Sequence, residues 1–213
     1  MAEESIRAFY EKAKHHGMLW TLKRLWFVLL RKTVHYEDST IIFYEIDGKM
    51  MPPIHARLEG MTYAWVPEKD QDQIAALKDA QLNADLIKHH FENNGRCLGA
   101  YHNERLVGYG WVFTDYFHFP YFDYILRMKA NTVYVGVTYV TPEYRGNGIQ
   151  PALFYELCYR LLAENYRYGL GSAIKDNLSS RRGIEKSGPQ PYGSLRVKKL
   201  FGKVIKKIET PIG

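Results

Sequence analysis

Residues 140–151 are the stretch of this sequence best suited to holding a phosphate. Arg145, Gly146 and Gly148 fall within four positions of one another. Glycines let the backbone approach a ligand closely, and successive N–H groups can then point into one concavity. A helix starting after such a turn adds a partial positive charge at its N-terminus. The pattern predicts an anion-binding turn, which the Arg145 guanidinium would reinforce.

The segments on both sides of this turn must position it. Residues 131–139 are rich in β-branched and aromatic side chains, which predicts a strand. Residues 152–162 carry apolar side chains at helical spacing, which predicts a helix. An ordinary strand-to-helix turn without a ligand is the alternative interpretation.

The same stretch resembles the signature of the GNAT superfamily of acetyl-CoA-dependent N-acetyltransferases. That signature is Gln or Arg, two residues, Gly, one residue, then Gly or Ala. Arg145 and Gly148 match it. In the family, a Val-x-Pro-Glu-Tyr sequence usually precedes the signature, and Val140, Pro142, Glu143 and Tyr144 match that sequence too. Gln150 departs from it, because the family has Gly or Ala at that position. Its side chain either crowds the turn or adds a hydrogen-bond donor.

The resemblance implies acetyl-CoA as the co-substrate and no metal. It implies that backbone N–H groups bind the pyrophosphate and that the strand end pairs with the pantetheine amides. The cofactor-binding residues expected on this basis are Tyr139, Val140, Arg145, Gly146, Asn147, Gly148, Ile149 and Gln150. A second landmark of the family is a helix that starts at an Asn. Asn177 would cap that helix and reach the pantetheine arm, with Ser180 facing the same way.

The residues for proton transfer are less well defined. Family members often place a Glu or His on the strand before the turn, but here we expect Tyr134, Gly136 and Thr138 on that face. Tyr134 is a weak base at neutral pH, because a Tyr normally has a pKa of about 10. His118 has a more suitable intrinsic pKa, and an ordered water or Asp123 is a further alternative.

For the general acid, the family often uses a Tyr on the second landmark helix. Ile184 stands where we expect that Tyr. Tyr139 and Tyr192 are therefore the candidates for the general acid, solely because their side chains could reach the thiolate. The catalytic candidates are therefore Tyr134, His118 and Tyr139.

The order of predicted elements agrees with the resemblance over roughly residues 60–190. Two helical segments lie within 70–91, and Asn83 can cap the second of them. A hairpin over 96–113 follows, then the strand, turn and helix described above. Strands at 39–46 and 61–66 would add to the domain ahead of its usual start. The predicted fold class is α+β, a mixed, mostly antiparallel central sheet flanked by helices, with an extra N-terminal helical segment.

Two further segments carry open alternatives. Residues 114–124 are densely aromatic, and we expect a connecting loop that either walls the substrate pocket or buries its own rings. Residues 193–208 predict a Lys-rich hairpin. Its lysines could bind nucleic acid, but protection of an edge strand explains them better, so no specific nucleic-acid partner is expected.

The N-terminal residues 1–35 are predicted to form a helical appendage to a catalytic domain of residues 36–213. Residues 18–30 include Trp20 and Trp26, but Lys23 and Arg24 interrupt the apolar run, so it is too short to span a bilayer. Peripheral membrane contact is one interpretation of this helix. Packing on the domain or in a homodimer is the favoured one. We see no cleavable signal peptide.

Composition sets the remaining limits. With 213 residues, 46% of them hydrophobic, the chain can form a packed core. A formal net charge of +6 favours anionic partners, with which coenzyme A agrees. Cys97 and Cys158 have no disulfide or metal spacing and predict a reduced, cytoplasmic protein. We expect an acyltransferase acting on a small-molecule or peptide amine; a CoA-binding or protein-interaction module without turnover is the alternative.

Overall fold

The computed structural model describes residues 26, 35–79 and 82–211. The chain divides into two compact units. One contains residues 40–195 and the C-terminal residues from 209 onward, and it holds every residue of the candidate site. Of the described residues, the other unit contains 26, 35–39 and 196–208. Of the predicted N-terminal appendage, only Trp26 and His35 lie within the described residues.

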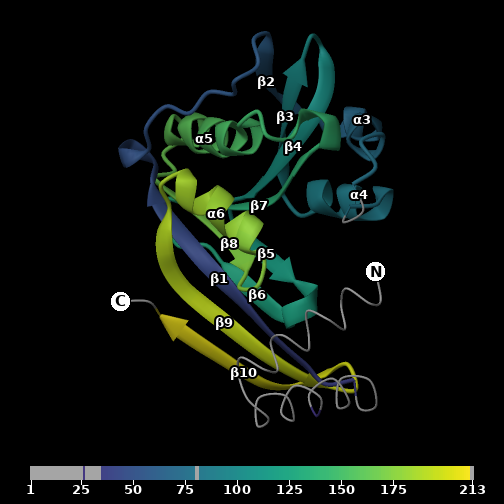
Figure 1. The fold of residues 1–213 in the computed structure, drawn as a ribbon, viewed down its shortest axis with the longest axis vertical. Helices are drawn as coiled ribbons and strands as arrows, with labels where there is room; N and C mark the ends of the chain where they lie inside the picture. Colours follow the sequence, from purple (N-terminus) through teal and green to yellow (C-terminus); the bar gives the residue numbers. More distant parts are fainter. Residues whose placement is uncertain (1–25, 27–34, 80–81, 212–213) are drawn as a thin grey trace, which may run out of the picture. The chain divides into compact units, whose positions relative to one another are not determined.

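A mixed, mostly antiparallel sheet forms the centre of the fold (Figure 1), as the sequence predicted. Its strand order is β10-β9-β1-β8-β7-β4-β3-β2. The pairs β1–β8, β2–β3, β3–β4 and β4–β7 are antiparallel, whereas β7–β8 is parallel. The strands are β1 (Glu37–Asp47), β2 (Met61–Val66), β3 (Arg96–His102), β4 (Arg105–Phe113), β7 (Thr132–Val140), β8 (Tyr168–Ile174), β9 (Gln190–Leu200) and β10 (Lys203–Pro211).

Helices cover this sheet. Figure 1 shows α5 and α6 side by side across one part of the sheet, with α3 and α4 beside β3 and β4. The helices are α3 (Gln71–Ala75), α4 (Ala84–Glu92), α5 (Ile149–Leu162) and α6 (Leu178–Lys186). Short 3-10 helices are η1 (Gly48–Met50), η2 (Glu68–Asp70), η3 (Pro120–Phe122) and η4 (Pro142–Tyr144). Asn83 caps α4 as predicted, because its side chain accepts a hydrogen bond from the Leu86 N–H.

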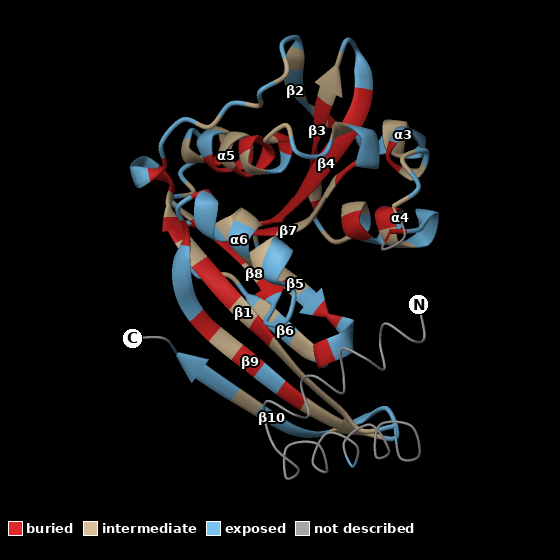
Figure 2. Ribbon diagram, in the orientation of Figure 1, coloured by how far each residue is buried: buried red, intermediate tan, exposed pale blue. Residues whose placement is uncertain are grey.

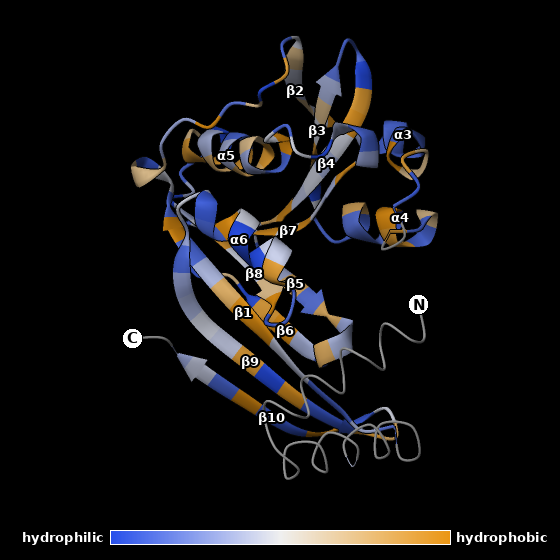
Figure 3. Ribbon diagram, viewed as in Figure 1, coloured by the Kyte–Doolittle hydropathy of each residue, from blue (hydrophilic) through white to orange (hydrophobic). Residues whose placement is uncertain are grey.

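The core lies between α5 and the sheet. Leu153, Leu157 and Leu161 are fully buried at helical spacing, and Val133 and Val135 of β7 belong to the same cluster. Figure 2 shows β4 buried along nearly its whole length, and Figure 3 shows the apolar residues of α5 and β4 that form this layer. In contrast, α6 has no buried residue. The predicted anion-binding turn therefore precedes a well-packed helix, whereas α6 is weakly packed.

The early strand occupies an unexpected place. β1 comes first in the sequence but does not lie at an edge of the sheet; it lies between β8 and β9. It pairs with β8 from Ile41 opposite Ile174 to Asp47 opposite Tyr168. β1 pairs with the edge of β8 opposite to β7, along the whole length of β8. The sequence predicted the strand correctly but could not predict its neighbours, since strand pairing is a long-range contact.

The aromatic segment is a β-hairpin, so the prediction of a connecting loop was wrong. β5 (Tyr116–Phe119) pairs with β6 (Tyr124–Arg127), and Asp123 turns the chain with a φ of 46°. Phe117 and Phe119 pack on Tyr134, with ring centroids 4.8 and 5.4 Å away. Each of these strands has only four residues, too few for a clear alternation of apolar and polar side chains in the sequence.

The predicted C-terminal hairpin is confirmed as β9 and β10, neighbours at the edge of the sheet. Leu195 and Val197 of β9 are buried, whereas Arg196 between them is exposed. Among the described residues, no helix is both long and apolar enough to cross a bilayer.

Candidate functional site

The two parallel strands at the centre of the sheet diverge and open a cleft. β7 pairs with β8 only from Thr132 opposite Tyr168 to Tyr134 opposite Leu170. Beyond that point β7 follows β4, and β8 follows β1. A cleft of about 50 Å³ lies where they part. It is lined by Val135, Gly136, Thr138, Gln150, Pro151, Phe154, Gly171, Ser172, Ser180, Gly183, Ile184 and Ser187.

The predicted anion-binding turn lies between β7 and α5. Gly146 and Gly148 have φ angles of 82° and 75°, a conformation that only glycine adopts without strain. Gly148 is the N-cap of α5. Within the described part of the chain, the backbone N–H groups of residues 146–150 donate to no protein acceptor. A row of free donors at a helix N-terminus is an arrangement that binds a phosphate.

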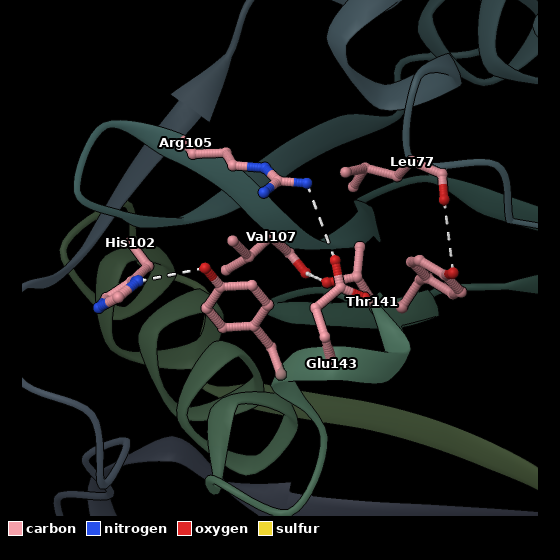
Figure 4. Close-up of polar contacts among 8 residues, drawn as sticks. Leu77, His102, Arg105, Val107, Thr141 and Glu143 are labelled. Atoms are coloured by element: carbon pink, nitrogen blue, oxygen red, sulfur yellow. Dashed lines mark hydrogen bonds and ion pairs between the residues drawn. The ribbon is translucent and has the colours of Figure 1, made fainter.

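Several contacts hold this turn against the sheet (Figure 4). Both the N–H and the hydroxyl of Thr141 donate to the Val107 carbonyl, at 3.0 and 3.1 Å. Glu143 lies 3.8 Å from the Arg105 guanidinium. Further contacts join His102 Nδ1 to the Tyr144 hydroxyl at 3.3 Å and the Tyr139 hydroxyl to the Leu77 carbonyl at 3.4 Å. The end of β7 and the 3-10 turn η4 are thus tied to β3, β4 and the end of α3.

The Arg145 and Asn147 side chains also brace the turn. Arg145 Nε donates to the Val140 carbonyl at 3.0 Å, and the guanidinium lies 5.7 Å from the centre of the Tyr139 ring. Asn147 Nδ2 donates to the Tyr144 carbonyl at 3.1 Å. The free donors at this turn are therefore mainly backbone N–H groups.

Gln150 spans the cleft. Its Nε2 donates to the Thr138 hydroxyl at 3.0 Å, which joins the first turn of α5 to β7. On the other side, its Oε1 would lie 4.0 Å from a Cβ placed on Gly183 of α6. The departure from the family signature therefore places an amide inside the cleft and leaves little free volume.

Asn177 caps α6 as predicted, because its Oδ1 accepts from the Ser180 N–H at 3.1 Å. Ser180 lines the cleft. Polar contacts anchor the rest of α6 to β1: the Tyr44 hydroxyl donates to Glu185 at 3.1 Å and accepts from Arg181 Nε at 3.1 Å. Burial raises the pKa of Tyr44, so this hydroxyl stays protonated at neutral pH.

The face assigned to Tyr134, Gly136 and Thr138 was only partly right. Gly110 lies opposite Thr138 and Val112 opposite Val135, so β7 contains one extra residue, a β-bulge. The bulge turns Thr138 toward α5, where it meets Gln150. Gly136 stays on the face of Tyr134, because a Cβ on Gly136 would meet Phe113 at 3.0 Å and Tyr134 at 3.3 Å.

Tyr134 lies deep under the aromatic hairpin. It is 4% exposed, and its hydroxyl is 2.7 Å from the Ser172 hydroxyl, which lines the cleft. Burial raises the pKa of Tyr134 and the Ser172 bond opposes the rise only partly, so Tyr134 stays protonated at neutral pH. A protonated Tyr can donate a proton but cannot remove one. Ser172 was missed by the sequence interpretation, since no motif marks it.

The other two catalytic candidates lie away from this hydroxyl pair. Tyr139 donates to Leu77 and stacks with Tyr109, at a centroid separation of 5.8 Å. His118 is exposed and alternates along β5 with Phe117 and Phe119, so it points away from Tyr134. Within the described residues, no group of three His, Cys, Asp or Glu side chains is arranged to hold a metal ion.

The diverging parallel strands and the glycine turn define an α+β domain with a cleft beside the N-terminus of α5. Residues 55–188 match the model of the acetyltransferase (GNAT) family, and the chain belongs to that family. No curated protein sequence gives a match.

Solved structures share the fold at low sequence identity. A GCN5-related N-acetyltransferase from Sphaerobacter thermophilus superposes with a TM-score of 0.59 at 16% identity, covering 82% of this chain and 56% of that one. A tandem GNAT protein from the clavulanic acid biosynthesis pathway gives 0.56 at 16% identity, covering 78% and 55%. A GCN5-related N-acetyltransferase-like protein from Streptococcus suis gives 0.51 at 13% identity, covering 82% and 67%. This chain thus spans little more than half the length of the first two.

Proposed function

We propose that this protein is an N-acetyltransferase that moves an acetyl group from acetyl-CoA directly to an amine. The observation that carries the proposal is the cleft between β7 and β8, lined by Gln150 and Pro151, next to the free N–H groups of residues 146–150. Backbone donors at the turn suit a pyrophosphate, and diverging strands leave backbone groups for the pantetheine amides. The residues present therefore fit this co-substrate.

In the proposed reaction the amine nitrogen attacks the thioester carbonyl, the C–S bond breaks, and the leaving thiolate takes up a proton. The N–H groups of residues 146–150 hold the phosphates, and α6 closes the cleft with Asn177 and Ser180. A backbone N–H of β7 beside the cleft stabilises the negative charge on the carbonyl oxygen. The Tyr134–Ser172 hydroxyl pair becomes the proposed proton donor to the thiolate, since both hydroxyls stay protonated and Ser172 lines the cleft. For the amine, an ordered water is the proposed proton acceptor.

A pair of glycine variants tests the cofactor site. Gly148 and Gly202 have φ angles of 75° and 76°, so an Ala at either position is strained by about 1–2 kcal/mol. We expect acetyl-CoA to raise the melting temperature of the wild type and of Gly202→Ala, but to stabilise Gly148→Ala much less. If the wild type shows no shift at millimolar acetyl-CoA, the proposed function is wrong.

A CoA-binding module without turnover is the second candidate, because no general base is evident among the described residues of the cleft. Release of free thiol in the presence of a panel of amines separates the two. A module would be stabilised by acetyl-CoA and release none.

The localisation, the domain division, the membrane contact and the oligomeric state are also proposals. We propose a cytoplasmic protein, supported by two free and buried cysteines, Cys97 and Cys158. The division into an appendage of residues 1–35 and a domain of residues 36–213, membrane contact through residues 18–30 and a homodimer rest on the sequence alone. Co-sedimentation with anionic vesicles, with and without replacement of Trp20 and Trp26 by Ala, tests the membrane contact.

A further inference from the structure

A second cavity, ten times larger than the cleft, lies within the same unit of the chain. Its volume is about 500 Å³, which is within the usual range for small-molecule sites. The described residues that line it are Phe43, Glu45, Tyr124, Leu126, Arg127, Lys129, Thr132, Leu170, Tyr192, Gly193, Ser194, Leu195, Glu209, Thr210 and Pro211. We refer to it as the β1–β6 cavity.

The β1–β6 cavity and the cleft are neighbours. Leu170 on its floor lies opposite Tyr134, and Ser172, two residues further along β8, lines the cleft. Residues two apart on a strand share a face and lie about 7 Å apart. The Tyr134–Ser172 hydroxyl pair therefore stands between the two spaces. A molecule in the β1–β6 cavity has its nearest end close to the point where the thioester is proposed to lie.

Most of the cavity wall comes from outside the part of the chain that matches the family. The match covers residues 55–188, whereas Phe43 and Glu45 belong to β1, and Tyr192 and Glu209 belong to β9 and β10. The cofactor cleft is lined entirely by residues within the match. We expect this difference between the two linings if the β1–β6 cavity selects a substrate that is specific to this protein.

The lining combines an apolar body with charges of both signs. Phe43, Leu126, Leu170 and Leu195 supply apolar surface, and Tyr124 and Tyr192 supply aromatic rings. Two carboxylates, Glu45 and Glu209, and two cations, Arg127 and Lys129, also line the cavity. Within the described part of the chain none of these four forms an ion pair closer than 4.0 Å. Lys129 Nζ instead donates to the Tyr192 hydroxyl at 2.9 Å.

Balanced charges disfavour a ligand of large net charge, such as a polyamine or a nucleotide, because like charges would be left unpaired. A zwitterion with an apolar side chain matches the apolar residues, the carboxylates and the cations of the lining. Its carboxylate would meet Arg127 and Lys129, and its N–H groups would meet the glutamates. Resting on the proposed acetyltransferase function, we propose that the β1–β6 cavity holds the acceptor, and that the acceptor is a short zwitterionic peptide with an apolar side chain.

Direct titration of a dipeptide tests the proposal without requiring turnover. The probe is leucyl-phenylalanine, compared with its C-terminal amide and with spermidine by calorimetry on the full chain. We expect the dipeptide to bind about tenfold more tightly than its amide, since the amide lacks the carboxylate. Spermidine should bind still more weakly.

Matched variants locate the site. Lys129→Met should reduce the tenfold difference between the dipeptide and its amide, because only Arg127 then remains to meet the carboxylate. Lys69→Met, at an exposed lysine of η2, should preserve the difference. Ser194→Phe places a ring in the cavity and should weaken the dipeptide at least tenfold, while the thermal shift with acetyl-CoA stays unchanged. The inference is overturned if the wild type does not bind the dipeptide, if it prefers spermidine, or if Ser194→Phe binds normally. Failure of the acetyl-CoA shift in the wild type would instead overturn the proposed function.

Discussion

The bond between Gln150 and Thr138 leads to the sharpest prediction about cofactor binding. The cleft has about 50 Å³ of free volume, whereas small-molecule sites usually need 300 Å³ or more. A pantetheine arm can therefore enter only after the Gln150 side chain has moved off Thr138. The perturbations are Gln150→Ala, which removes the crossing side chain, and Thr138→Val, which removes only the hydrogen-bond acceptor.

The magnitude follows from the geometry. The bond is 3.0 Å long and exposed to solvent, so its net contribution lies in the lower part of the usual 0.5–1.5 kcal/mol, about 0.5–1 kcal/mol. Since the wild type loses this energy on binding, either variant should bind acetyl-CoA about two- to fivefold more tightly. The double variant should gain no more than Gln150→Ala alone, because both changes remove one interaction.

Calorimetric titration of acetyl-CoA measures the effect, and Gln73→Ala on the exposed surface of α3 is the control. A contrary pattern is easy to recognise. If Gln150→Ala weakens binding while Thr138→Val strengthens it, the amide donates to the bound cofactor and is not an obstacle. If neither variant changes the affinity, the cleft is opened by a movement of α6 and not by Gln150.

Two further predictions concern stability. Burial among aromatic rings lowers the pKa of His90 from 6.5 to about 4, and the charge of His89 adds to this effect, so the unfolded chain binds the proton more readily. The free energy of unfolding should therefore fall by about 3 kcal/mol as the pH drops from 7 to 4; denaturant titrations should find this pH dependence reduced in His90→Phe and kept in His89→Gln. A Cβ on Gly169 would lie 2.8 Å from the Cys158 sulfur, whereas a Cβ on Gly183 would meet its nearest atom at 4.0 Å. Gly169→Ala should thus cost about 1–3 kcal/mol, and Gly183→Ala in α6 should gain about 0.5–1 kcal/mol; equal thermal stability of the two variants would contradict the packing of β8 on α5.

The sequence was most informative where function and local structure depend on neighbouring residues. Gly146, Gly148 and the apolar spacing after them predicted the turn and α5, because φ preference and helical periodicity are local properties. Asn83 and Asn177 were predicted as caps for the same reason, and both side chains accept the expected backbone N–H. The order of strands and helices was sufficient for the fold class.

Tertiary structure alone decided which side chains share the cleft. The bulge in β7 turned Thr138 toward Gln150, and a one-residue insertion of this kind leaves no pattern in the sequence. The pairing of Tyr134 with Ser172 joins residues 38 positions apart, and the insertion of β1 beside β8 gave the β1–β6 cavity one of its walls. These contacts depend on the register of distant strands. The sequence by itself therefore determined the glycine turn before α5, whereas only the fold determined which residues line the cleft and the β1–β6 cavity.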